Sequence, residues 1–404
     1  MALDKNGKPL PKGITWIEKK KLYMARFTYQ GTSYTIYDKE LKVIKKKLAD
    51  KRYEVEHGLS GKLDKITLNT WYESWLKDYK SKKVKKNTII TYQRLYETHI
   101  RNTLGKKQLS QIKAIHVQKF YNDLIEKDYS ASSLGVIHAM LSNIFKIAVN
   151  NDLIMKNPCK GTELPIVENE ERRVLSIEEQ KYISNYIKRE NWQFYEPIIT
   201  TMLGTGVRVG EVLGLKWEDI DFEKKTLSIN KTLEYRRLES TGKFGFEEDT
   251  PKSPNSIRTI PLSQSVIQAL KRQKRNQNFL KLQGNWTPKQ GFETLVFTGR
   301  KGQPQEKLYI RNMLIRLVKE INEHEAKKAK EENRTPIVIE PINPHALRHS
   351  FATRCFEADM PPKTVQILLG HANIGMTMNL YTHVTEQKKV EDMQKLDRLL
   401  LNVV

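Results

Sequence analysis

The sequence predicts a multidomain protein that is mainly α-helical and carries small β-sheets. Its 404 residues are long for one domain and suggest two or three. Hydrophobic residues make up 38% of the chain, which is enough for packed cores. The front of the chain alternates polar and apolar residues as strands do, and most of the remainder follows the longer period of helices.

The first module is predicted at residues 1–60, as three strands and one helix. Three runs are rich in Tyr, Thr, Ile and Phe and are therefore typical of strands: ITWIEK, LYMARFTYQ and SYTIYD. A turn at Gly31 precedes the last run. From about residue 39 to 57, apolar residues recur at helical spacing while lysines mostly face the other side. A module this small needs close packing to stand alone. Residues 58–63 are then typical of a linker.

A second, helical domain is predicted at residues 64–160. Trp71 and Trp75 lie on one apolar face with Leu68, which favours a place in the core over a role in stacking bases. Three further helices are expected at about 87–102, 109–127 and 132–148. The last has the clearest helical rhythm of apolar residues.

The third domain is predicted at residues 170–404 and begins with the capping-box sequence SIEE at 176–179. Three strands of one sheet are expected at 227–234, near Phe246 and at 257–262, with a turn at 251–254 between the last two. The amphipathic segment 392–404 is expected either as a final core helix or as a piece packed on a neighbouring subunit.

The charge distribution indicates a polyanionic partner. The formal net charge is +23, of which residues 1–60 carry +7 and residues 61–160 carry +10, leaving +6 for the other 244 residues. A basic front with a nearly balanced rear fits a chain whose N-terminal part follows nucleic acid. No signal peptide is apparent, and no apolar run is long enough to span a membrane. Cys159 and Cys355 match no zinc or disulfide pattern and are expected as reduced structural thiols.

The stretch INPHALRHSFATRCFEADMPPKTVQILLGHANIGMTMNLYTH holds the clearest chemical signal. Pro344 suits the first position of a helix and Asn343 suits its cap. His345, Arg348 and His349 then fall at i, i+3 and i+4, so the helix presents them on one side. A histidine packed behind the helix is the plainer interpretation of His349.

Further along the same stretch, Gly370 can end a second helix, His371 follows at once, and Tyr381 comes after a short helical run. Arginine offers a planar fork for phosphate oxygens, histidine moves protons near neutral pH, and tyrosine can act as a covalent nucleophile. Together these residues suggest phosphoryl transfer. A zinc site is disfavoured, because the two helical histidines lack the glutamate of H-E-x-x-H. No cofactor is expected, since the sequence has neither a Walker A nor a dinucleotide motif.

These residues are recognisable as a pattern. HALRHSFAT, LLGHANI and YTH resemble the histidine, second-arginine and tyrosine boxes of the tyrosine recombinases, the phage-type integrases. Upstream, GTGVRVGEVLGLKWEDID resembles the first arginine box, with Arg208 and its acidic companion Glu211. TPKSPNSIRTIPL resembles the hairpin that carries the catalytic lysine, here Lys252. Five boxes in the right order over roughly 180 residues make chance agreement very improbable.

The resemblance implies a division of labour among the three domains. Residues 1–60 would be an arm-type DNA-binding domain whose sheet enters the major groove, 64–160 a core-binding (SAM-like) domain, and 170–404 the catalytic domain. The expected DNA contacts are basic or aromatic residues of the first two domains: Lys19, Lys20, Lys21, Tyr23, Arg26, Lys82, Lys83, Lys85 and Lys86. A solvated basic sheet is the plainer interpretation of the first module.

The resemblance also implies the chemistry. Tyr381 would attack the phosphodiester and leave a 3′-phosphotyrosine link, while Arg208 and Arg348 would hold the two non-bridging oxygens. Since this link keeps the bond energy, strand exchange would need neither ATP nor a metal.

The remaining site residues receive supporting roles. Lys252 would donate a proton to the departing 5′ oxygen and His345 would be the base for the phenol. His371 would donate a hydrogen bond to the phosphate, and Glu211 would orient a neighbouring basic side chain.

The function expected is that of a site-specific recombinase of a phage or conjugative transposon, active in integration and excision. Its partners would be duplex DNA at core and arm sites, three further copies of the chain in a homotetramer, an excisionase and a host DNA-bending protein. A cytoplasmic location in a bacterium is expected. Two alternatives stay open: a type IB topoisomerase, disfavoured by the front module, and a catalytically silent DNA-binding regulator, disfavoured by the five intact boxes.

Overall fold

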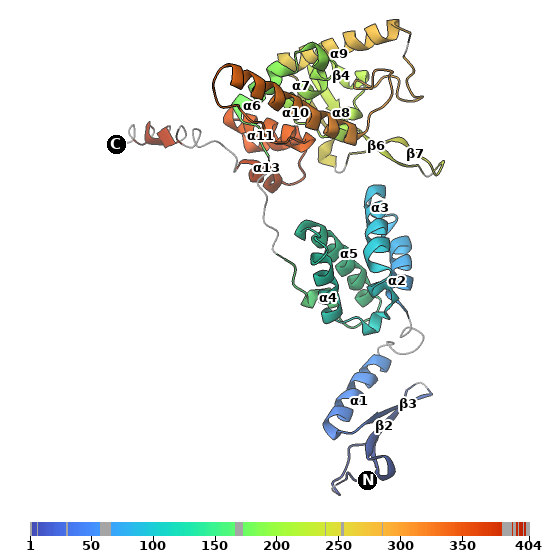
Figure 1. The fold of residues 1–404 in the computed structure, drawn as a ribbon. Helices are drawn as coiled ribbons and strands as arrows, with labels where there is room; N and C mark the ends of the chain where they lie inside the picture. Colours follow the sequence, from blue (N-terminus) through green and yellow to red (C-terminus); the bar gives the residue numbers. More distant parts are fainter. Residues whose placement is uncertain are drawn as a thin grey trace. The chain divides into compact units, whose positions relative to one another are not determined.

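The computed structural model describes residues 2–5, 7–29, 31–56, 66–165, 173–238, 240–251, 254–284 and 286–381, together with residues 390, 393–394, 396–398 and 400. The chain forms two compact units, residues 1–169 and 170–404 (Figure 1). The expected amphipathic segment at 392–404 falls largely outside the described residues.

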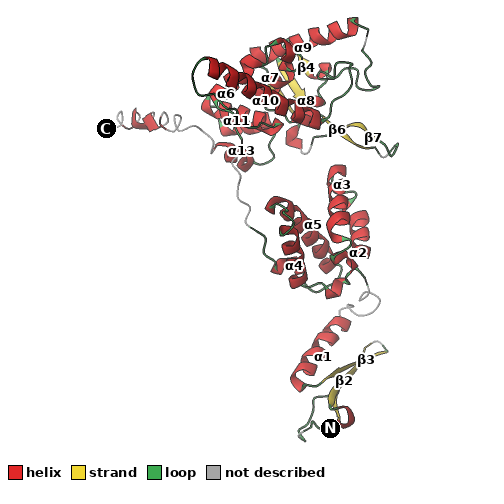
Figure 2. Cartoon of the chain, viewed as in Figure 1, coloured by secondary structure: helices red, strands yellow, loops and turns green. Residues whose placement is uncertain are grey.

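The front module has the predicted three strands and helix. Strands β1 (Ile14–Ile17), β2 (Leu22–Tyr29) and β3 (Thr32–Asp38) form an antiparallel sheet in that order, and α1 (Leu41–Glu56) packs on it (Figure 2). Side chains alternate along β2, so Tyr23 and Ala25 are buried with Ile44 of α1 while Arg26 is exposed on the other face. The module therefore has a small core of its own and an open sheet face.

The helical domain follows the predicted order. Its elements are α2 (Leu68–Ser74), continued by a π-helical turn at Trp75–Lys80, α3 (Lys86–Leu95), continued by another at Tyr96–Ile100, α4 (Ala114–Ile125) and α5 (Ala131–Asn150). The indole N–H groups of Trp71 and Trp75 donate to Ile144 O and Asn143 Oδ1. Both rings are buried, which confirms that they are core residues.

The third helix begins later than expected. Leu109–Gln111 forms a separate 3-10 turn, and the helix starts only at Ala114. The backbone of Ile112 and Lys113 is extended, which interrupts the helical hydrogen bonds that the apolar spacing suggested. Local backbone geometry overrides periodicity here.

Helix α5 is long and apolar enough, by length and composition alone, to cross a membrane. Its fully buried residues Leu134, Ile137, Leu141 and Ile144 instead belong to the core of the helical domain. We therefore interpret α5 as a core helix.

The second unit is built mainly from helices around one large apolar core. They are α6 (Ile177–Tyr186), α7 (Glu196–Thr205), α8 (Val209–Leu213), α9 (Gln264–Leu282), α10 (Lys307–Glu331), α11 (Pro344–Glu357), α12 (Pro362–Leu369) and α13 (Ile374–Tyr381). The predicted capping box is present at the start of α6, where Ser176 Oγ accepts from Glu179 N.

The strands of this unit form two sheets, where one was predicted. Strands β4 (Ile220–Asp221), β5 (Thr226–Ile229) and β8 (Arg258–Pro261) form one sheet, and β6 (Thr232–Arg237) pairs with β7 (Phe244–Asp249) in a separate ribbon (Figure 2). Asn230 and Lys231, which lie between β5 and β6, both donate to the Asp219 carboxylate. Strands β7 and β8 therefore belong to different sheets, so the prediction of one sheet is wrong, and the expected turn at 251–254 lies partly outside the described residues.

Packing within the second unit gathers segments that are far apart in the sequence. Helix α11 packs on α7, α13 packs on α11 and α12, and α12 packs on β8. The boxes that contain Arg208, Arg348 and His371 thus meet at one place.

Candidate active site

Arg208 is the N-cap residue of α8. Its backbone N–H donates to Glu211 Oε2 (2.9 Å) and its Nη1 donates to Glu211 Oε1 (2.7 Å). The side chain is 26% exposed, so one edge of the guanidinium faces solvent. Gly206 precedes it with φ of 63°, and a Cβ there would clash with the ring of Phe351, which explains the glycine. The Glu211 carboxylate therefore holds the fork through Nη1, and the side chain stays partly exposed to solvent.

The Glu211 carboxylate is shared between two arginines. Its side chain is only 1% exposed, and Arg258 Nη2 donates to Oε2 at 2.9 Å. Burial raises the pKa of Glu211, but Arg258 and then Arg208 more than offset this, so the pKa is lowered overall. The carboxylate is consequently ionised at neutral pH and holds both guanidinium groups.

Arg348 on α11 is the most deeply buried of the expected catalytic cations. Its Nη1 donates to Gly206 O (2.6 Å) and its Nη2 to Leu369 O (2.7 Å). Burial, and next the positive charge of Arg208, lowers the pKa of Arg348 to about 9. The group keeps its charge at neutral pH, and no carboxylate of the described residues bonds to Nη1 or Nη2, an arrangement that favours binding of an anion.

Three consecutive carbonyls at the end of α12 each accept a hydrogen bond from a different arginine. Leu368 accepts from Arg258, Leu369 from Arg348 and Gly370 from Arg208, at 2.6, 2.7 and 3.3 Å. Helix C-termini leave their last carbonyls without helical partners and carry partial negative charge, so cations are stabilised there. Within this network three guanidinium groups and one carboxylate leave a charge of +2, which favours binding of an anionic phosphodiester.

His371 directly follows this helix end and is buried. Its Nδ1 lies 2.9 Å from Thr377 Oγ1 on α13. Burial, and then the charges of Arg348 and Arg208, lowers the pKa of His371 to about 3, so the ring is neutral near pH 7. If Nδ1 accepts from the threonine hydroxyl, the proton of the neutral ring sits on Nε2, which could then donate to a phosphate oxygen.

His345 and His349 lie one turn apart on α11, as their spacing predicts, with ring centroids 6.3 Å apart. His345 is exposed, whereas His349 is half-buried. A general base has to reach the proton that it removes, and the exposed ring of His345 is accessible to a bound substrate. The partial burial of His349 agrees with the packing role.

Two predicted catalytic residues, Lys252 and Tyr381, lie wholly or partly outside the described residues. Tyr381 is the last residue of α13, next to α11 and α12, but its side chain lies outside what is described. Lys252 lies outside the described residues altogether. Their assignments stay predictions.

The predicted DNA contacts differ in their surroundings. Lys19, Lys20 and Lys21 are exposed beside the sheet of the front module, and Arg26 is exposed with its Nε donating to Ser33 Oγ. The structure corrects the prediction that Tyr23 contacts DNA. This residue is 3% exposed and packs against Trp16, with ring centroids 4.7 Å apart. Strand alternation turns it toward the core, so its ring is not available on the surface.

The second basic cluster lies at the start of α3. Lys82, Lys83 and Lys86 are exposed and Lys85 is half-buried. This end of a helix carries partial positive charge, which adds to the attraction of the lysines for phosphate.

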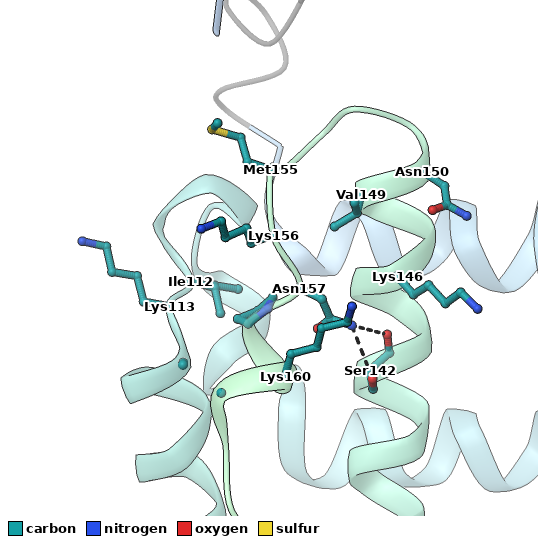
Figure 3. Close-up of a pocket in the computed structure, with 13 residues that line it drawn as sticks. Ile112, Lys113, Ser142, Lys146, Val149, Asn150, Met155, Lys156, Asn157 and Lys160 are labelled. Carbon is teal, nitrogen blue, oxygen red and sulfur yellow. Dashed lines mark hydrogen bonds between the residues drawn. The ribbon is translucent and has the colours of Figure 1, made fainter. Parts of the chain in front are cut away.

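Other features of the described residues do not suggest a second chemistry. They contain no group of three or more His, Cys, Asp or Glu residues able to hold a metal. Cys159 and Cys355 are buried and free, as expected. A cavity of about 920 Å³ is lined by residues 112–114, by helix α5 and by residues 155–161, and its lysines Lys113, Lys146, Lys156 and Lys160 come from separate parts of the lining (Figure 3).

Sequence reasoning missed two residues of this network. Arg258 lies within the segment that predicted Lys252, yet a basic residue on a strand gave no sign that it would turn inward. Thr377 was passed over as part of a short helical run. Its position six residues after His371 carries no recognisable spacing signal, because a turn separates the two.

The comparisons with known proteins agree with this geometry. Residues 173–388 match the phage integrase family, and residues 67–125 match the phage integrase N-terminal SAM-like domain. The chain therefore belongs to the phage integrase family of tyrosine recombinases. As such it is a site-specific recombinase of a mobile element, which confirms the fold and enzyme class that the boxes predicted.

Individual relatives extend over most of the chain. A tyrosine recombinase XerC-like protein of Caldanaerobacter subterraneus subsp. tengcongensis is 31% identical over 358 residues, covering 86% of this chain and 87% of its own length. The Tn1549 transposon integrase bound to a circular intermediate DNA is 27% identical with a TM-score of 0.68, covering 82% and 99%. The λ integrase tetramer bound to a Holliday junction shares the fold at 19% identity and a TM-score of 0.52, covering 92% and 95%.

Proposed function

We propose that the arginine network and Tyr381 cleave and rejoin DNA through a 3′-phosphotyrosine intermediate. The phenol oxygen of Tyr381 attacks phosphorus, the bond to the 5′ oxygen breaks, and a 5′-hydroxyl strand is released. Attack by such a strand in the reverse direction rejoins DNA and frees the tyrosine. Because each step exchanges one phosphoester bond for another, the reaction needs no ATP.

The observation that carries this proposal is the +2 charge held by fixed hydrogen bonds at the end of α12. Negative charge develops on the non-bridging oxygens as phosphoryl transfer proceeds, and prearranged donors stabilise it. Arg208 and Arg348 supply these donors. Both keep N–H groups beyond those already bonded to carbonyls and to Glu211, since each guanidinium has five.

Proton transfer falls to the remaining residues of the boxes. His345, exposed on α11, accepts the phenol proton of Tyr381, whose unperturbed pKa is about 10. His371 donates from Nε2 to the phosphate, and Lys252 protonates the departing 5′ oxygen. Glu211 orients Arg208.

DNA is held by the other domains, with residues 1–60 on arm sites and 64–160 on core sites. The exposed lysines and Arg26 of the front module and the lysines at the start of α3 supply phosphate contacts. The Tn1549 integrase was solved with a circular intermediate DNA, which supports the core-site assignment. The proposed location is the bacterial cytoplasm, where the DNA substrate lies.

Recombination of two duplexes requires four strand cleavages. Each chain offers Tyr381 as one nucleophile, so a homotetramer is the proposed active assembly. An excisionase and a host DNA-bending protein are proposed as further partners that set direction and bring arm sites near core sites.

A suicide duplex, nicked so that the 5′-hydroxyl fragment diffuses away, tests the proposal. The full chain should form a covalent adduct at the element's end and lack it on scrambled DNA, with or without a chelator. A silent regulator would bind without an adduct. Relaxation of a plasmid that lacks the site, at the same rate as one that has it, would favour the topoisomerase alternative.

A truncation tests the role of the front module. A chain that starts at residue 64 should still cleave a core site but fail in full integration, which needs two DNA sequences held in one complex. Residues 1–63 should bind a separate duplex with affinity that falls steeply as salt rises. Overlapping footprints of the two fragments, or normal integration by the truncated chain, would make the module a generic basic appendage.

A further inference from the structure

Arg258 joins three parts of the site with one guanidinium. Its Nε donates to Leu368 O (2.6 Å), its Nη1 to Ser256 O (2.9 Å) and its Nη2 to Glu211 Oε2 (2.9 Å). The side chain is 3% exposed. These partners belong to the end of α12, the segment before β8 and helix α8. A buried residue with every nitrogen engaged cannot itself reach DNA.

We propose that Arg258 is a positioning residue for DNA cleavage, which sets the direction of the Arg208 fork through Glu211 and holds the end of α12 ahead of His371. The proposal rests on the function proposed above, in which Arg208 and His371 contact the phosphate. It adds a residue that the recombinase boxes did not mark.

The two carboxylate oxygens of Glu211 accept hydrogen bonds from different arginine groups. One carboxylate oxygen, Oε1, accepts from the side chain of Arg208, while Oε2 accepts from Arg258 and from the Arg208 backbone N–H. A carboxylate and a guanidinium alone prefer a two-bond, fork-to-fork pairing. Because Arg258 occupies Oε2, the Arg208 side chain bonds to Glu211 through Nη1 only, which leaves Nη2 to donate to Gly370 O and to a phosphate oxygen.

The end of α12 packs closely against the segment before β8. Gly370 has φ of 67°, and a Cβ there would lie 2.9 Å from Asn255 O and 3.1 Å from Arg258 Nη1. The helix end therefore sits directly against the segment that Arg258 crosses. Because His371 is the next residue, the bond from Arg258 to Leu368 O limits where its ring can lie.

A lysine could not replace this arrangement. Three acceptors around one planar group require a fork with separately directed N–H bonds, whereas an ammonium is a compact point charge. Arg258→Lys is thus the gentle variant and Arg258→Met the severe one. Arg272→Met is the matched control, because Arg272 pairs with Glu196 through two bonds in the same unit but touches none of these residues.

The experiment measures single-turnover adduct formation on the suicide duplex at saturating protein, from pH 5.5 to 9, together with DNA affinity and thermal midpoint. Arg258→Met should lower the cleavage rate roughly 10- to 100-fold, as small misplacements of reacting groups do. DNA affinity should change less than about threefold. The cleavage rate of Arg258→Lys should lie between those of the unaltered protein and Arg258→Met. Arg272→Met should cleave like the unaltered protein.

The pH profile separates positioning from plain stabilisation. Among the described residues, the charged groups that act on Glu211 are Arg258 on β8, Arg208 at the start of α8 and Arg348 on α11, and His371 lies against these arginines. Arg258 lowers the pKa of Glu211, so its removal raises that pKa, and the rate should then fall on acidification at a higher pH than in the unaltered protein. In the double variant Glu211→Gln with Arg258→Met this added acid limb should vanish, and the rate near pH 6 should be no lower than in Arg258→Met alone.

An equal loss at every pH, in proportion to a lowered thermal midpoint, would overturn the proposal and leave Arg258 a structural ion pair. So would Arg258→Lys or Arg258→Met variants that cleave like the unaltered protein. Failure of the unaltered protein to form an adduct would instead reject the proposed function, and this inference with it.

Discussion

The cations of the two units differ in how they are held. In the second unit, Arg258 and Arg348 are buried, and their nitrogens bond to backbone carbonyls whose positions the helices fix. In the first unit, the lysines beside the front sheet and at the start of α3 are mostly exposed. Burying the arginines of the second unit costs desolvation free energy but fixes their geometry. The exposed lysines of the first unit lose little solvation, and their charged groups stay mobile.

The difference teaches how one chain separates rate from affinity. A transition state differs from its ground state by small shifts of charge, which only fixed donors distinguish. A DNA backbone offers a row of phosphates that mobile lysines follow equally well at many registers. Changes in the buried network should therefore alter cleavage, and changes among the exposed lysines should alter binding.

The largest effect is expected from Tyr381→Phe, which removes only the nucleophilic oxygen. Covalent adduct on denaturing gels should disappear, while the affinity measured by gel shift stays within about twofold. Tyr309→Phe is the control, since Tyr309 also loses a hydroxyl, here one bonded to Tyr195. An adduct formed by the Tyr381 variant would mean that another residue is the nucleophile.

The second-largest effect on cleavage is expected from a substitution of Arg208. Arg208→Lys keeps the charge but loses the fork that contacts Glu211 and Gly370 and that we propose for the phosphate, so cleavage should fall roughly 100- to 1,000-fold with binding retained. Single-turnover rates at saturating protein measure this, with Arg272→Lys as control. A rate within a few-fold of the unaltered protein would reject the assignment of Arg208.

The lysines at the start of α3 should show the opposite behaviour. Glutamine at Lys82, Lys83 and Lys86 together should weaken DNA binding roughly tenfold and reduce the slope of log K against log salt by up to about 2.7. Cleavage at saturating protein should be unchanged. The same change at Lys327, Lys328 and Lys330, which are exposed on α10, is the charge-matched control. Equal losses in both triples would show that only total charge matters.

The smallest effect is expected from Thr377→Val, which removes the hydroxyl next to His371 Nδ1. Losing one hydrogen bond of about 1 kcal/mol should slow cleavage roughly fivefold, because the ring then loses its fixed tautomer and orientation. Thr353→Val is the control: it is also buried, and its hydroxyl has no hydrogen-bond partner within the described part of the chain. A loss as large as that of Arg208→Lys would indicate a fault in the packing of α13.

Local patterns in the sequence were sufficient for much of the fold. The three strands and helix of the front module, the core place of Trp71 and Trp75 and the capping box at Ser176 follow from alternation, apolar spacing and cap chemistry. The late start of α4 and the division of the strands at Asn230 did not follow, because extended backbone at Ile112 and the contact of Asn230 with Asp219 depend on neighbours distant from the pattern.

The sequence by itself determined the recombinase class, the order of the boxes and the positions of Arg208, Glu211, Arg348 and His371. These can be read because helix caps and turns confine them to short motifs. Only the tertiary structure decided that three arginines share the end of α12, that Arg258 joins them and that Tyr23 turns inward. The physical reason is that every residue has a backbone carbonyl. A hydrogen bond to a carbonyl therefore requires no particular residue type there and leaves no pattern in the sequence.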